Sequence, residues 1–217
     1  MNRAISTLTL ALITGLSLPN AAHAGWLDWL FGKDEASSET TVADPLAHFT
    51  AAITEQAKAQ GGSLIKDLAK DMNGSVATLA SLLGGSPEQV KTLNNTLGAF
   101  QENFSAKDFT TLLTSLSGLT SGGLNEEQQG ALTNTMKAAT AFGLQTFLSD
   151  SPYKSDVEKV ITSLRSGNYV SAIQPMIKLS ENAKLSPEHQ GLVDAAKGYF
   201  QKLGSSKALD SLKGLLK

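Results

Sequence analysis

The sequence predicts an all-α protein of about eight or nine helices and no sheet. After residue 44, apolar residues recur three and four positions apart, which is the spacing of one face of an α-helix. Glycine pairs at 61, 84 and 122 interrupt this spacing and are typical of helix ends. No stretch alternates apolar and polar residues as a half-buried strand does. We therefore expect antiparallel helical hairpins that form a short irregular stack or bundle.

The composition is that of a globular chain and excludes several kinds of site. Of 217 residues, 41% are hydrophobic and 18% are charged, which suffices for a folded domain. The chain has no cysteine, so disulfides, thiol catalysis and thiolate metal sites are excluded. A net charge of -2, without a basic aromatic face, argues against a nucleic-acid partner.

Residues 1–24 have the three parts of a cleavable signal peptide. Arg3 supplies a basic start, residues 4–18 are mostly apolar, and Ala22-His23-Ala24 offers the small residues that a signal peptidase requires. The apolar run of about 15 residues is shorter than the roughly 20 that span a bilayer as a helix. We therefore expect cleavage after Ala24 and an exported protein, either periplasmic or secreted.

Residues 25–43 would form the new N-terminus, ahead of a helical domain over 44–217. Aromatic side chains crowd into the first positions of this segment, at Trp26, Trp29 and Phe31. These three are candidates for contact with a membrane interface or with a groove on a protein. The alternative is a helical turn that folds back on the core. The rest of the segment is rich in Ser, Thr and Glu and is interpreted as a flexible linker.

The first two helices are delimited by a cap and by glycines. Asp44-Pro45 supplies an N-cap acid and a proline at the first helical position. The apolar spacing that follows stops at Gly61-Gly62. Residues 63–83 keep one apolar face across Gly74, so they form either one helix weakened at this glycine or two helices with a tight joint.

Three further segments have clear helical stripes. Residues 86–104 have the most regular apolar spacing, and residues 105–119 keep a stripe despite many Ser and Thr residues. We expect a loop at 120–123. Residues 125–148 form the longest predicted helix, which Ser151-Pro152 ends.

The last helices are short and less regular. Ser155 and Glu158 have the spacing of a capping box for a short helix that closes at Gly167. The next helix, 168–183, contains Pro175, which either kinks it or starts a new helix. Two final helices are expected at 186–203 and 207–216.

Three helix starts share a capping pattern, in which a Ser or Asn precedes a polar residue by three positions. The side chain at the cap accepts a hydrogen bond from a backbone N–H of the first helical turn, and the side chain three positions later can accept one from the backbone N–H of the cap residue. The pairs are Ser86 with Gln89, Asn125 with Gln128, and Ser186 with His189. Capping explains this pattern without any functional role.

The helices before these starts also match one another. Residues 107–113 (Lys-Asp-Phe-Thr-Thr-Leu-Leu) align with 167–173 (Gly-Asn-Tyr-Val-Ser-Ala-Ile), and 72–79 is a fainter copy. A polar or glycine turn, an aromatic and then a small or apolar pair resembles the helix-turn-helix unit of tetratricopeptide-type repeats. The resemblance implies stacked hairpins with a surface for partner peptides. The caps at 86, 125 and 186 lie 39 and 61 positions apart, so the spacing is irregular compared with that family.

No catalytic, cofactor-binding or metal-binding residues are predicted. His48 and His189 lie in separate helices without metal-ligand spacing, and Glu126-Glu127 is adjacent rather than facing. Neither a nucleophile elbow nor a phosphate-binding glycine loop occurs. We therefore expect an exported, non-catalytic interaction or scaffold protein with a protein partner. The alternatives are a membrane-surface protein that uses the Trp-rich N-terminus and the Lys-rich C-terminal helix, and a small-ligand carrier or enzyme with an unrecognised site.

Overall fold

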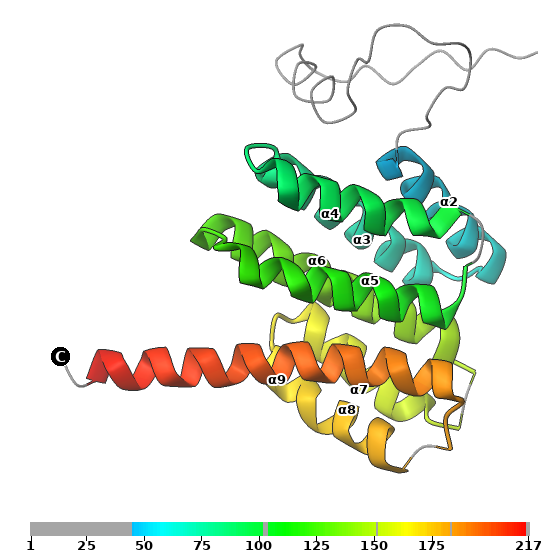
Figure 1. The fold of residues 1–217 in the computed structure, drawn as a ribbon. Helices are drawn as coiled ribbons and strands as arrows, with labels where there is room; N and C mark the ends of the chain where they lie inside the picture. The colour runs from blue at the N-terminus through cyan, green and yellow to red at the C-terminus, as the bar shows by residue number, and fades with distance from the viewer. Residues whose placement is uncertain (1–44, 102–103, 151, 183, 216–217) are drawn as a thin grey trace, which may run out of the picture. The chain divides into compact units, whose positions relative to one another are not determined.

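The computed structural model describes residues 45–101, 104–150, 152–182 and 184–215, which all belong to one compact unit, Glu35–Lys217 (Figure 1). These residues form eight α-helices and two short 3-10 helices, and none of them lies in a strand. The prediction of an all-α fold with eight or nine helices is confirmed. The elements are α2 (Pro45–Gln60), α3 (Ser63–Leu83), α4 (Pro87–Gly98), η1 (Ala99–Gln101), α5 (Ala106–Gly118), η2 (Leu119–Gly122), α6 (Glu126–Leu148), α7 (Lys154–Arg165), α8 (Tyr169–Asn182) and α9 (Pro187–Leu215).

Helix α6 is the central element. It packs against α3, α5, α7 and α9, and every residue from 138 to 144 is buried. Seven consecutive residues cover all sides of a helix, so neighbours surround α6 at this level. Its contacts with α3 and α9 join helices that are far apart in the sequence.

The remaining helices, α2, α4 and α8, pack on the helices that contact α6. α4, α5 and α9 follow one another across the face seen in Figure 1, where α4 contacts α5 and α5 contacts α9. α2 packs on α3 and α4, whereas α7 and α8 pack on each other. A cluster of phenylalanines joins α2, η1, α5 and α6, with neighbouring ring centroids 5.2–6.4 Å apart: Phe49, Phe100, Phe104, Phe109, Phe142 and Phe147.

Three possible breaks in the helices do not occur. α3 is one helix through Gly74, and α9 continues where two helices were predicted. An isolated glycine costs about 1 kcal/mol of helix propensity, which neighbouring packing can offset. α8 also continues through Pro175. A proline costs about 3 kcal/mol or more in a helix interior, but Met176 and Leu179 beyond it are fully buried and hold the second half of α8 in place.

Two predicted boundaries are corrected. The helix expected over 86–104 ends as α-helix at Gly98 and continues only as the 3-10 turn η1, and residues 102 and 103 lie outside the described residues. The loop expected at 120–123 is largely the 3-10 helix η2. Both changes tighten the end of a helix, where the last carbonyls lack intrahelical partners.

The predicted caps have mixed outcomes. The capping box of Asn125 and Gln128 is confirmed, and the His189 backbone N–H donates to Ser186 Oγ at 3.3 Å. The Ser86 side chain makes no cap hydrogen bond, and the Gln89 backbone N–H donates to the Ser86 carbonyl at 3.0 Å. The Gln89 side chain does not reach back to Ser86 either, since its Nε2 donates to the Gly122 carbonyl at 3.0 Å. The capping box predicted at Ser155 is wrong, because α7 already begins at Lys154.

Candidate functional site

The aromatic residues predicted for partner or membrane contact, Trp26, Trp29 and Phe31, lie outside the described residues, as do the segments predicted to be a signal peptide and a linker. Of the two histidines that follow residue 24, His48 is exposed on α2 and His189 is partly buried, its ring 6.3 Å from that of Phe147. Within the described residues, no group of three or more His, Cys, Asp or Glu side chains is placed to hold a metal ion. Nor is any described helix both long and apolar enough to cross a membrane.

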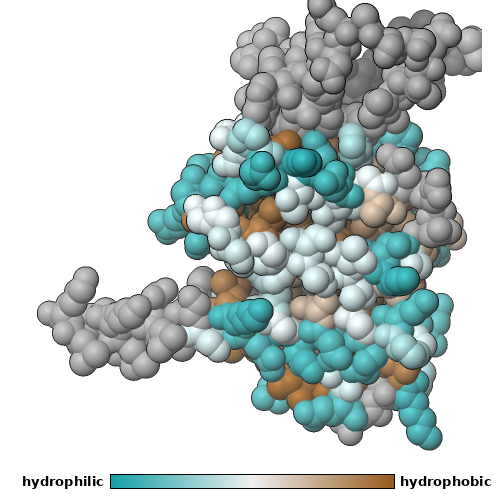
Figure 2. Space-filling model, viewed as in Figure 1, coloured by the Kyte–Doolittle hydropathy of each residue, from teal (hydrophilic) through white to brown (hydrophobic). Residues whose placement is uncertain are grey.

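The face of the molecule shown in Figure 2 has no large apolar patch. Figure 2 shows hydrophobic residues on the face of α4, α5 and α9 only as small separate patches among polar ones. Val170 is the one large hydrophobic side chain that is exposed among the described residues. A broad hydrophobic interface is therefore not visible on this face, and hollows in the surface are the better candidates for a site.

The most suitable hollow is a groove between α3 and α6, which is bordered by Leu164 and Arg165 in the last turn of α7. We call it the α3–α6 groove, and its volume is about 490 Å³. Each long side of the groove is one helical ridge. α3 contributes Leu68, Asp71, Ser75 and Thr78, and α6 contributes Ala131, Asn134, Ala138 and Ala141.

The ridges determine the length and depth of the groove. On each helix these four residues are spaced three, four and three apart, and Lys70 and Gly74 of α3 and Lys137 of α6 line the groove as well. Each ridge spans ten residue steps, or about 15 Å at 1.5 Å per residue. Five of the lining residues are small: Gly74, Ser75, Ala131, Ala138 and Ala141. A partner backbone could therefore approach α3 and α6 closely.

A partly buried hydrogen bond joins the two walls of the groove. Thr135 of α6 is fully buried, and its hydroxyl donates to the Ser75 carbonyl of α3 at 3.0 Å. Because the same hydroxyl also lies 2.9 Å from the Ala131 carbonyl of its own helix, the side chain is held in one orientation. The groove is thus formed by rigid elements rather than by loops.

The rim of the groove is charged and mainly basic. Lys70, Lys137 and Arg165 line it, with Asp71 as the one acidic lining residue. Arg165 Nε lies 4.0 Å from Asp71 Oδ2, and the two side chains are 44% and 52% exposed, respectively. A long, exposed pair of this kind adds little stability and leaves both groups open to a ligand.

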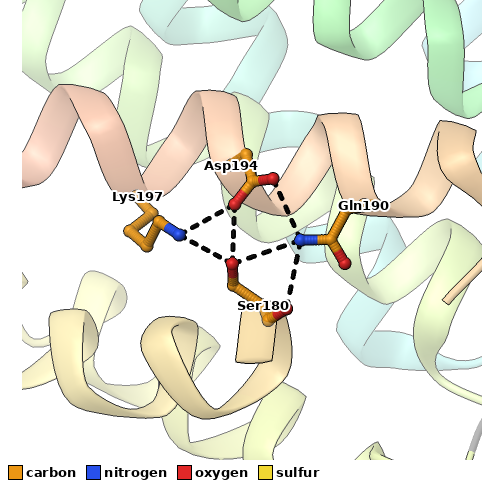
Figure 3. A network of polar contacts seen from close by, with 4 residues as sticks. All are labelled: Ser180, Gln190, Asp194 and Lys197. Carbon is orange, nitrogen blue, oxygen red and sulfur yellow. Dashed lines mark hydrogen bonds and ion pairs between the residues drawn. The ribbon is translucent and has the colours of Figure 1, made fainter. Parts of the chain in front are cut away.

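A second polar cluster lies between α8 and α9 (Figure 3). Ser180 of α8 donates to Asp194 Oδ1 at 2.7 Å, and Lys197 Nζ donates to Ser180 Oγ at 2.6 Å and to Asp194 at 2.8 Å. Gln190 Nε2 completes the cluster, at 3.2 Å from the Ser180 carbonyl and 2.9 Å from Asp194 Oδ2. Partial burial by itself raises the pKa of Asp194, but hydrogen bonds from Lys197, Ser180 and Gln190 outweigh it and lower that pKa below its ordinary value.

This cluster resembles a nucleophile beside a base, but the hydrogen bonds indicate a structural role. A serine nucleophile must give its proton to the neighbouring base. Here Lys197 donates to Ser180, while Ser180 directs its own proton to Asp194. None of the four residues lines the α3–α6 groove or either of two further surface hollows, which lie beside Gly61-Gly62 and beside Tyr199. The cluster therefore fastens α8 to α9.

Two other hollows are less suitable. One of about 510 Å³ lies beside the Gly61-Gly62 turn, where Lys154 is balanced by Asp150 and Glu158. The other, of about 220 Å³, is bordered by Tyr199, whose hydroxyl lies 3.2 Å from Thr133 Oγ1. Burial raises the pKa of Tyr199, although the bond to Thr133 acts in the opposite direction.

No protein-family model matches the chain, and no curated protein or solved structure matches it either. The resemblance to tetratricopeptide repeats therefore stays a prediction, and geometry alone has to support a function. The α3–α6 groove was not predicted from the sequence. The signal was the small residues at 131, 138 and 141, which equally fit a buried helix face.

Proposed function

We propose that this protein is a non-catalytic interaction protein that binds a segment of a partner protein in the α3–α6 groove. The observation that carries the proposal is the groove itself, which is about three helical turns long and is lined by small residues and by charged residues. Grooves of this form accept peptide side chains at regular spacing, whereas charged groups at the rim select among partners.

A peptide fits this groove better than a small ligand does. Small-molecule sites enclose most of the ligand surface and combine apolar walls with a few convergent polar groups. The α3–α6 groove is instead open along its length, and its charged residues lie at the rim rather than converging on one point. Neither His48 nor His189 lines it, so the groove does not have the histidine lining that would favour a carrier or an enzyme.

Site-specific photo-crosslinking tests this proposal. A photoreactive residue at Thr78, which is exposed and lines the groove, is compared with one at Thr92, which is exposed on α4. The positions are matched, because each hydroxyl donates to the carbonyl four residues earlier at 2.9 Å. We expect a crosslinked partner protein from native cells at position 78 only, and equal products at both positions would refute a specific site.

We also propose that the protein is exported and works outside the cytoplasm, on the support of the signal-peptide pattern in residues 1–24. N-terminal sequencing of the protein from its native cells should give Gly25 as the first residue. A chain that keeps Met1 and stays in the cytoplasmic fraction would refute this part of the proposal. The crosslinking result does not depend on it.

A further inference from the structure

We draw no further inference here: the strongest candidate, the hollow of Tyr199 and Lys202 between α5, α6 and α9, offers a ligand only one charged side chain, which is exposed, and nothing in the structure shows what fills it.

Discussion

Replacing Gly143 by alanine should destabilise the protein, although alanine favours helices more than glycine does. Gly143 lies in the buried middle of α6, where this helix meets α5 and α9. A Cβ at this position would lie 3.0 Å from Phe109 Cδ1 and 3.4 Å from Leu192 Cδ1. At Gly74 in α3, by contrast, a Cβ would meet no heavy atom within 4 Å. The two glycines therefore form a matched pair of helix-interior positions.

The opposing effects at Gly143 can be compared. Alanine gains up to about 1 kcal/mol of helix propensity at either position. At Gly143 this gain is opposed by overpacking, which typically costs about 1–3 kcal/mol. Phe109 cannot easily yield, because it is fully buried and its ring packs at 5.3 Å from that of Phe100 and 5.8 Å from that of Phe142. We expect Gly143→Ala to lose about 1 kcal/mol and Gly74→Ala to gain about 0.5–1 kcal/mol.

Urea unfolding followed by circular dichroism measures both changes. The midpoint should fall for Gly143→Ala and rise for Gly74→Ala, with similar slopes. Phe109→Leu should be less harmful in the Gly143→Ala background than in the wild type, because the smaller side chain makes room. If Gly143→Ala stabilises the protein as much as Gly74→Ala does, the inference that a Cβ at position 143 overpacks against Phe109 is wrong.

Three further predictions concern caps, acid and membranes. Ser105→Ala and Asn125→Ala should each cost about 1 kcal/mol in the same urea assay, because both side chains accept a cap hydrogen bond, whereas Ser86→Ala should cost clearly less, because that side chain caps nothing. The pKa of Asp194 is lower in the folded state than in the unfolded state. The contribution of this carboxylate to the free energy of unfolding is therefore complete above about pH 4 and is lost as the pH falls through the folded pKa. The difference in unfolding free energy between wild type and Asp194→Asn should therefore shrink below about pH 4, and a difference that grows there would contradict the lowered pKa. This difference should stay under about 1 kcal/mol at any pH, since the Asp194 side chain is 44% exposed. If residues 25–33 contact membranes, the protein cleaved after Ala24 should co-sediment with anionic vesicles and the same protein lacking 25–33 should not, and equal behaviour of the two would remove this idea.

The sequence by itself determined the all-α class and the positions of most helices. Apolar spacing, the prolines at helix starts and the glycine stops act within a few residues, so they can be recognised without knowing the neighbours. The cap of α6 is a clear case, since Asn125 and Gln128 bond to each other's backbone and need no other element.

Only the tertiary structure decided which helices meet. Ser86 and Gln89 have nearly the same local pattern as Asn125 and Gln128, yet the packing of α4 near η2 draws Gln89 to the Gly122 carbonyl. The α3–α6 groove likewise forms between helices separated by two others in the chain. A small residue on a helix face has the same local pattern whether it packs inside the core or lines a groove. Contacts between helices far apart in the sequence determine which of these two cases applies, and they therefore determine where the candidate site lies.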